Sequence, residues 1–292
     1  MTEKSVFIGL GRMGSPMAQR ILAEGLPLVV HNRDVGKTKP LVDLGAKVAD
    51  GLDGAVAGAD LIMTMVSDDS ALLAVAEEGR LKKAAPGLIH VSLSTVGVDT
   101  VLYLESLHES LGQTLLSCPV FGRPEAAREG KLNLCLSGPK AAKDKALAYL
   151  EPMGKVWDFG LRPQGSNAVK LAGNFMIASL IELLSEAFSL VENHGVPPEA
   201  FFGLMSGTLF NAPAVHTYGR LILEADFDKA GFLGSLGAKD AGLVREAARR
   251  SHTPMPFCSA LEDRFLRLLA RGWGDKDWSA ISDLQREDAG LK

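Results

Sequence analysis

The first half of the chain alternates short apolar runs with segments of helical spacing. Apolar runs lie at Ser5–Ile8, Leu28–His31, Leu61–Val66 and Leu88–Ser92. Between them apolar residues recur at helical intervals, as in Ser15–Leu22. Buried strands that alternate with helices are typical of a parallel sheet covered on both faces. We therefore predict a doubly wound α/β sheet in this half.

Two further strands and then a change of pattern follow. Leu115–Pro119 and Leu132–Ser137 have the character of strands, and a loop rich in charge, glycine and proline separates them. From Asn167 to Val191 the helical spacing continues without a breaker, which predicts one unusually long helix. The remainder indicates helices punctuated by proline and glycine. We predict an α/β domain over residues 1–164 and an all-α domain over residues 165–292 that begins with a long interdomain helix.

The amino-acid composition argues against a nucleic-acid partner and against a metal site. The chain is 47% hydrophobic and 23% charged, with a formal net charge of -4, so it lacks the basic excess of nucleic-acid-binding surfaces. Cys118, Cys135 and Cys258 are widely separated and form no CxxC pair. This pattern predicts buried thiols in a reducing compartment and no metal site.

Neither a leader nor a membrane span is expected. The first residues lead directly into an apolar strand, without a long hydrophobic region or a cleavage site. The most apolar part of the long helix, Phe175–Leu184, contains Glu182, so no apolar run approaches the length of a span. We expect a cytoplasmic protein without a membrane partner.

A glycine motif lies between the first strand and the first helix. The G-x-G-x-x-G pattern is formed by Gly9, Leu10, Gly11, Arg12, Met13 and Gly14. Gly9 permits the tight turn, Gly11 lets the backbone approach a pyrophosphate, and Gly14 allows the helix to pack on the sheet. In this setting the motif predicts a dinucleotide site on a Rossmann-type domain. The alternative is a glycine turn without a ligand.

The end of the second strand indicates which dinucleotide binds. An acidic residue there would accept from the ribose 2'-hydroxyl of NAD, whereas this chain has Asn32 followed by Arg33. The Arg33 guanidinium can pair with a 2'-phosphate, so we expect NADP and consider NAD the weaker candidate. In the alternative interpretation, Asp34 accepts from the ribose and Arg33 is a solvated surface charge.

Lys170 and Asn174 are four residues apart on one face of the long helix. An ammonium group beside an amide can protonate a carbonyl oxygen as hydride arrives and withdraw the proton in the oxidative direction. Such polar pairs are common on helices, and on the helix alone an exposed lysine would be the default interpretation.

Several motifs together resemble those of the β-hydroxyacid dehydrogenases, and the likeness covers nearly the whole chain. Besides the glycine motif they are Asn32-Arg33, Leu93-Ser94-Thr95, Pro119-Val120-Phe121-Gly122, the Gly165-x4-Lys170-x3-Asn174 helix and Lys239-Asp240. That family includes 3-hydroxyisobutyrate dehydrogenase, tartronate semialdehyde reductase and the glyoxylate/succinic semialdehyde reductases. The resemblance implies an NADP-binding domain, a C-terminal domain like that of 6-phosphogluconate dehydrogenase, and hydride transfer to or from a small oxo or hydroxy acid.

The resemblance also implies roles for single residues. Lys170 would be the general acid/base and Asn174 its partner in orienting substrate. Ser94 would contact substrate and Thr95 the nicotinamide ribose, although a Ser-Thr pair after a strand is also a common helix cap. The adenosine side would be lined by Met65, Val66 and Ser67, and Lys239 would close over the cofactor. By itself, Lys239-Asp240 would be an ordinary solvated pair.

One loop departs from the family pattern. Members typically have Ser-Gly-Gly where this chain has Phe121-Gly122-Arg123. Phe121 adds bulk, Gly122 keeps a backbone cradle, and Arg123 offers a bidentate clamp for a carboxylate. We expect all three to line the substrate site. Alternatively Phe121 packs in the core and Arg123 points to water.

Two other functions stay open at this point. An imine reductase-like enzyme or a catalytically silent NADP-binding scaffold could share the fold, but retention of Lys170 argues against both.

The long helix is apolar on more than one face, which predicts a homodimer or homotetramer. The alternative is that the C-terminal helices cover it within one chain.

Overall fold

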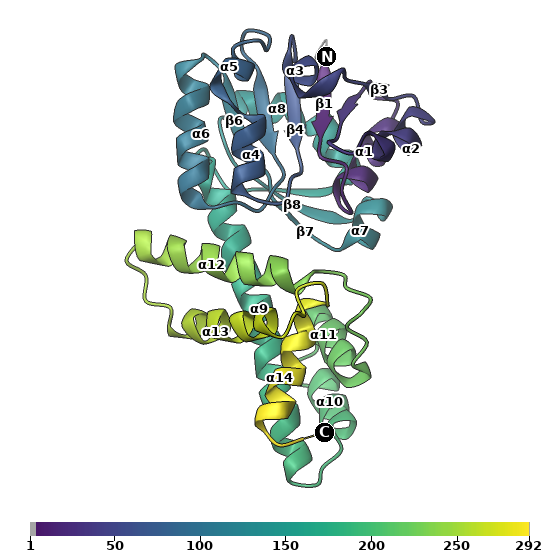
Figure 1. Cartoon of the computed structure of the whole chain (residues 1–292), viewed down its shortest axis with the longest axis vertical. Helices are drawn as coiled ribbons and strands as arrows, with labels where there is room; N and C mark the ends of the chain where they lie inside the picture. The colour runs from purple at the N-terminus through teal and green to yellow at the C-terminus, as the bar shows by residue number, and fades with distance from the viewer. Residues whose placement is uncertain (1–3, 292) are drawn as a thin grey trace. The chain divides into compact units, whose positions relative to one another are not determined.

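The computed structural model describes residues 4–291 and divides into two compact units between Lys170 and Leu171. The first unit is a layered α/β structure, and the second consists of helices (Figure 1). The predicted fold class is therefore confirmed. The N-terminal residues 1–3, where no leader was expected, lie outside the described residues.

A six-stranded parallel sheet forms the centre of the first unit, with the order β3-β2-β1-β4-β5-β6. Its strands are β1 (Ser5–Ile8), β2 (Val29–His31), β3 (Lys47–Val48), β4 (Leu61–Thr64), β5 (Ile89–Ser92) and β6 (Thr114–Ser117). The order reverses between β1 and β4. Ligands of such sheets bind in the crevice at the carboxyl ends of the strands beside this reversal.

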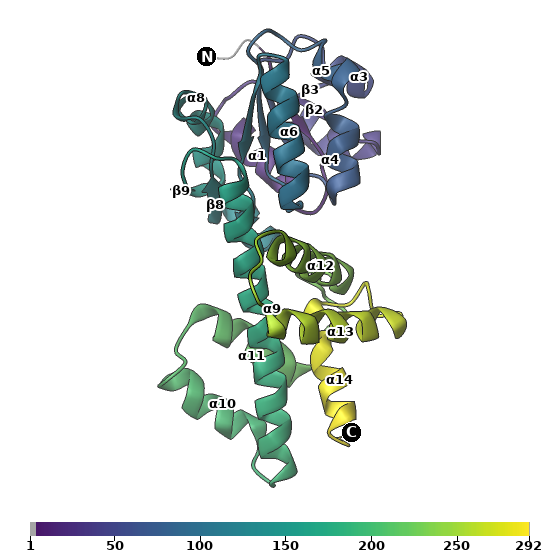
Figure 2. The same cartoon turned by 90° about the vertical axis from the view of Figure 1, so that its left-hand side faces the viewer.

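Two hydrophobic layers cover this sheet because successive strand residues point to opposite faces. Phe7 belongs to a cluster that includes Met17 of α1, whereas Val6 packs with Leu72 of α4 and Leu104 of α6. Figure 2 shows α4 and α6 side by side on the second face. The helical segments up to β6 are α1 (Gly14–Ala23), η1 (Val35–Thr38), α2 (Lys39–Val42), α3 (Gly51–Val56), α4 (Asp69–Val75), α5 (Glu78–Leu81) and α6 (Val98–Ser110).

The two later predicted strands exist, but they lie in different sheets. Leu132–Leu136 forms β8, the centre of a second sheet with the order β7-β8-β9. Only Cys118 and Pro119 separate β6 from β7, which is too short for the crossover that another parallel strand would need. The remaining elements here are β7 (Val120–Phe121), α7 (Pro124–Glu129), α8 (Lys140–Leu150), η2 (Glu151–Met153) and β9 (Gly154–Asp158).

The predicted long helix is α9 (Gln164–Asn193), which begins in the first unit and continues through the second. One face of its later part, with Ile181, Leu184 and Phe188, packs into a core that includes Phe265 and Trp278. The other elements of this unit are α10 (Pro198–Gly207), α11 (Pro213–Glu224), α12 (Gly234–Arg250), α13 (Pro256–Ala270), η3 (Trp278–Ala280) and α14 (Ile281–Asp288).

The expectation that no apolar run approaches the length of a membrane span was wrong for α9. By length and hydropathy this helix could cross a membrane, because Glu182 alone does not offset the apolar residues around it. In the structure Ile181 is fully buried in the helical core, and the Glu182 carboxylate pairs with Arg264 at 2.6 Å. One face of α9 is therefore packed in the helical core, whereas Met176 and Leu183 on another face are exposed.

Candidate functional site

The glycine motif forms a tight turn after β1. Gly9 has φ +98°, and its N–H donates to the His31 carbonyl over 3.0 Å. A Cβ on Gly9 would overlap the Met65 carbonyl oxygen, and one on Gly14 would overlap the Gly9 carbonyl oxygen. Apart from Gly11 and its two chain neighbours, no atom of residues 4–291 lies within 4 Å of the corresponding point at Gly11. Two glycines therefore permit backbone packing, while the third leaves an open approach for a ligand.

This turn leads directly into α1, so its exposed backbone faces the positive end of a helix dipole. Gly11 and Arg12 are exposed, Met13 is partly exposed, and Leu10 is buried in the core. Open backbone at a helix N-terminus beside the strand-order reversal fits the pyrophosphate of a dinucleotide.

Asn32 supports this turn. Its Oδ1 accepts from the Leu10 N–H over 2.9 Å, and its Nδ2 donates to the Asp34 carbonyl over 2.9 Å. Arg33 is exposed beside it. The Asp34 carboxylate accepts from the Gly36 N–H over 3.0 Å and so begins η1. In this structure Asp34 already has a local structural role.

Ser94 joins the ends of two neighbouring strands. Its Oγ accepts from the Val66 N–H over 2.8 Å, and its side chain is fully buried. Met65 continues the pairing with β1, since its N–H donates to the Ile8 carbonyl over 2.9 Å. The hydroxyl of Ser94 thus holds the Met65–Ser67 segment in place, and its contact with substrate stays a prediction. Thr95 follows it, partly exposed.

Buried polar groups fasten the start of α9 to the first unit. The Ser166 hydroxyl donates to the Ser117 carbonyl over 2.9 Å, and the Asn167 Nδ2 donates to the Val96 carbonyl over 3.1 Å. Ser117 also donates to the Oδ1 of Asn167. These bonds fix the first helical turn, and Lys170 follows within the next.

Lys170 lies against the loop that departs from the family pattern. Its Nζ is 4.1 Å from the centroid of the Phe121 ring. Gly122, with φ +140°, packs so closely on Leu132 that a side chain there would collide with it. Arg123 is partly exposed and immediately precedes α7. The structure therefore brings Phe121 and Lys170 together, and Gly122 and Arg123 follow Phe121 in the chain.

Cys135 is also close to Lys170. Burial raises the pKa of the Cys135 thiol, and the Lys170 ammonium acts in the opposite direction. As predicted, Cys118, Cys135 and Cys258 are buried free thiols. Within residues 4–291 no group of three or more His, Cys, Asp or Glu side chains could hold a metal ion.

Asp240 connects two predicted residues of the helical unit. Asn174 donates from Nδ2 to one Asp240 carboxylate oxygen, and the Lys239 Nζ lies 3.2 Å from the other. Asp240 is only 2% exposed. Asp240 is not among the site residues that the sequence predicts. The available signal was a carboxylate on the buried face of α12, at helical spacing from Gly237 and Val244.

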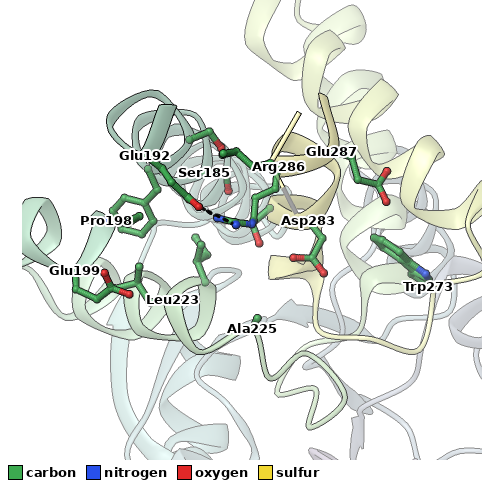
Figure 3. Close-up of a pocket in the computed structure, with 15 residues that line it drawn as sticks. Ser185, Glu192, Pro198, Glu199, Leu223, Ala225, Trp273, Asp283, Arg286 and Glu287 are labelled. Carbon is green, nitrogen blue, oxygen red and sulfur yellow. Dashed lines mark hydrogen bonds and ion pairs between the residues drawn. The ribbon is translucent and has the colours of Figure 1, made fainter. Parts of the chain in front are cut away.

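The helical unit also contains a cavity of about 640 Å³, and no predicted site residue lines it. Figure 3 shows the Arg286 guanidinium paired with the Glu192 carboxylate at its wall. Burial raises the pKa of the nearby Asp283 carboxyl. The lining is contributed mainly by α9, α10, α11 and α14.

Sequence models of two protein families match adjoining parts of the chain. Residues 4–165 match the NAD-binding domain of 6-phosphogluconate dehydrogenase. Residues 165–284 match the model described as NAD-binding of NADP-dependent 3-hydroxyisobutyrate dehydrogenase.

Individual proteins show the same relationship. The chain is 37% identical to the uncharacterized oxidoreductase YfjR of Bacillus subtilis, over 95% of this chain and 98% of that protein. It is 31% identical to 3-sulfolactaldehyde reductase of Escherichia coli, over 98% of this chain and 96% of that protein. A solved structure of Mycobacterium tuberculosis 3-hydroxyisobutyrate dehydrogenase with L-serine is 27% identical with a TM-score of 0.88, covering 98% of this chain and 100% of that one. Since these matches span nearly the whole chain, it belongs to the β-hydroxyacid dehydrogenase family of NAD(P)-binding oxidoreductases.

Proposed function

We propose that this protein is an NADP(H)-dependent oxidoreductase that interconverts a small aldehyde or keto acid and the corresponding hydroxy acid. The reaction would resemble that of a semialdehyde or glyoxylate reductase, with Lys170 as general acid/base. The observation that carries this proposal is the position of the Lys170 ammonium over the ring of Phe121, the first residue of the Phe121-Gly122-Arg123 loop, in a chain of this family.

The chain's own groups account for the proton and for orientation. When bound, NADPH supplies the hydride for the carbonyl carbon. Lys170 donates a proton from Nζ to the carbonyl oxygen, and it recovers that proton in the oxidative direction. The Asn174 amide orients the substrate, and the bond from Nδ2 to Asp240 fixes which way that amide faces. Lys239, also paired with Asp240, would close over the cofactor.

The choice of NADP over NAD rests on the end of β2. Asn32 is used to hold the glycine turn, and Asp34 is used to begin η1. The Asp34 carboxylate is therefore already bonded within the chain, which argues against its pairing with the ribose 2'-hydroxyl of NAD. The exposed guanidinium of Arg33 supports pairing with a 2'-phosphate.

The substrate is proposed to be small and anionic. The Escherichia coli relative is named for 3-sulfolactaldehyde, an aldehyde that carries a sulfonate. In this chain Arg123 could hold a carboxylate or sulfonate while Gly122 leaves backbone accessible beside it.

Replacement of Lys170 tests the proposal. NADPH oxidation would be measured with a panel of semialdehydes, keto acids and cyclic imines. Lys170→Ala should lower kcat on the best acid substrate by at least about 100-fold, because a positioned general acid usually contributes this much. The variant should still bind NADPH. Lys170→Arg keeps the charge but releases a proton poorly near neutral pH, so it should not restore the rate.

Other outcomes would replace this proposal. Near-parental kcat in Lys170→Ala would remove Lys170 from the mechanism. Turnover of cyclic imines in preference to the acids would favour an imine reductase-like enzyme. Binding of NADPH without turnover of any compound would favour a silent scaffold.

We also propose a homodimer or homotetramer that uses the outer face of α9. Met176, Leu183 and Leu190 are exposed at intervals of seven residues, so they form one apolar stripe. A second copy of the chain would cover this stripe in a symmetric assembly. Leu183→Glu should reduce the mass in sedimentation equilibrium, and an unchanged mass would exclude this face.

A cytoplasmic location is proposed from the free cysteines, and cell fractionation tests it.

A further inference from the structure

Lys170, the proposed acid/base, contacts the aromatic ring of Phe121. The Nζ of Lys170 lies over the ring of Phe121, 4.1 Å from its centroid. This distance lies well within the range over which an aromatic ring attracts a cation through its quadrupole. The two residues come from elements far apart in the sequence, β7 and α9.

The ring is held by the second sheet. Phe121 pairs with Asn133 of β8, and the Asn133 Oδ1 accepts from the Trp157 Nε1 of β9 over 2.9 Å. The next residue, Gly122, packs against Leu132 without space for a side chain. These contacts restrain the backbone on both sides of the ring, so its direction is set by the sheet.

The ammonium group is held from the other direction. Ser166 and Asn167 bond the first turn of α9 to backbone carbonyls of the first unit. Lys170 is 8% exposed and lies beside the buried thiol of Cys135. In such a weakly hydrated setting a ring face stabilises a cation more than it does at an exposed surface.

We propose that Phe121 is a positioning residue that holds the Lys170 ammonium through its ring face and thereby sets the pH range in which Lys170 exchanges its proton. The ring favours the charged amine over the neutral one. It therefore raises the pH at which Lys170 loses its proton and keeps the group in its donor form. This inference rests on the proposed function, in which Lys170 is the general acid/base.

An NMR titration of the lysine side chains tests the inference without requiring turnover. The full-length protein would carry ¹³C-labelled lysine, with the Lys170 signal assigned from Lys170→Arg. Phe121→Leu keeps an apolar side chain but removes the ring, and Phe121→Tyr is the matched control that retains it. The titration midpoint of Lys170 should fall by about 0.5 to 1 unit in Phe121→Leu, because cation–π contacts contribute about 0.5–2 kcal/mol. It should stay near the parental value in Phe121→Tyr, and the exposed Lys229 serves as an internal reference.

The outcomes separate this inference from the proposed function. An unchanged Lys170 midpoint in Phe121→Leu overturns the inference, whatever the activity of Lys170→Ala. A lowered midpoint supports it, and the acidic-side pH limit for oxidation of the hydroxy acid should then shift downward equally. A lowered midpoint in a protein that reduces no substrate would support the ring contact and contradict the proposed function. If Phe121→Leu does not fold, Phe121→Met provides the non-aromatic comparison.

Discussion

The amide oxygen of Asn32 accepts a 2.9 Å hydrogen bond from the backbone N–H of Leu10, and so the end of β2 is bonded to the glycine turn. The same side chain donates to the Asp34 carbonyl. Asn32 therefore determines the shape of the turn on which a pyrophosphate would rest. Arg33, next to it, is exposed.

Asn32→Ala should weaken the binding of NADPH and NADH alike. Loss of one structural hydrogen bond costs about 1 kcal/mol, which corresponds to about a fivefold higher Kd. Fluorescence titration with both cofactors measures it. Asn32→Asp keeps the acceptor and should preserve the turn while disfavouring NADPH. A change confined to one cofactor in Asn32→Ala would mean that Asn32 contacts that cofactor directly.

Arg33→Ala should remove the preference for NADPH. We expect the parent to bind NADPH at least about tenfold more tightly than NADH, a difference of about 1.4 kcal/mol. The Kd for NADPH should rise in the variant while that for NADH stays constant. Arg33→Lys should retain part of the preference, since it keeps the charge but not the bidentate geometry. Equal affinities in the parent would assign cofactor choice elsewhere.

Arg123→Ala should raise KM for acid substrates by about tenfold or more and leave kcat nearly unchanged. The reason is that the clamp would bind the anionic end of the substrate and take no part in bond making. Parallel kinetics on a carboxylate aldehyde and an uncharged aldehyde of similar size provide the comparison. If both respond equally, Arg123 serves the fold of the loop instead.

A chain of buried hydrogen bonds crosses one layer of the first unit. Thr64 Oγ1 lies 3.0 Å from the His90 Nε2, and the His90 Nδ1 lies 3.0 Å from the His108 Nε2. The His108 Nδ1 reaches the Gln113 Oε1 at 3.0 Å, and the Gln113 Nε2 donates to the Leu81 carbonyl. Because Gln113 donates its amide hydrogen to Leu81, its oxygen accepts from the His108 Nδ1. Burial lowers the pKa of both imidazoles, so both are neutral near pH 7, and the His108 Nε2 then accepts from the His90 Nδ1.

Acid should destabilise the protein through these imidazoles. Burial lowers the pKa of His90 and lowers that of His108 to about 4, whereas the unfolded chain takes up protons near 6.5. The contribution of the neutral imidazoles to the free energy of unfolding is therefore fully present above pH 6.5. It is lost as the pH falls toward 4, by about 3 kcal/mol for His108. Urea unfolding between pH 7 and 4.5 measures this slope. His108→Gln should be less stable at pH 7 and show a flatter slope, and an identical slope would assign the acid sensitivity to other groups.

Local patterns in the sequence were sufficient for the main elements. The strands at Ser5–Ile8 and Ile89–Ser92 and the helix Gln164–Asn193 follow from the periodicity of apolar residues, which depends on neighbours a few positions away. The glycine motif likewise acts through backbone geometry within one turn. Such features are encoded by short segments, and so they can be predicted without knowledge of the whole fold.

Contacts between distant segments required the tertiary structure. Leu132–Leu136 has the apolar character of a strand, but its place in a second sheet depends on the short link after β6. From the sequence alone Asp240 would be a solvated carboxylate, and only the packing of α12 places it against Asn174. The ring of Phe121 could equally have packed in the core, and only the joint placement of β7 and α9 puts it over Lys170. The spacing of apolar residues indicates which face of an element is buried. The partner of a polar or aromatic side chain depends on packing between distant segments, and no short stretch of sequence contains that information.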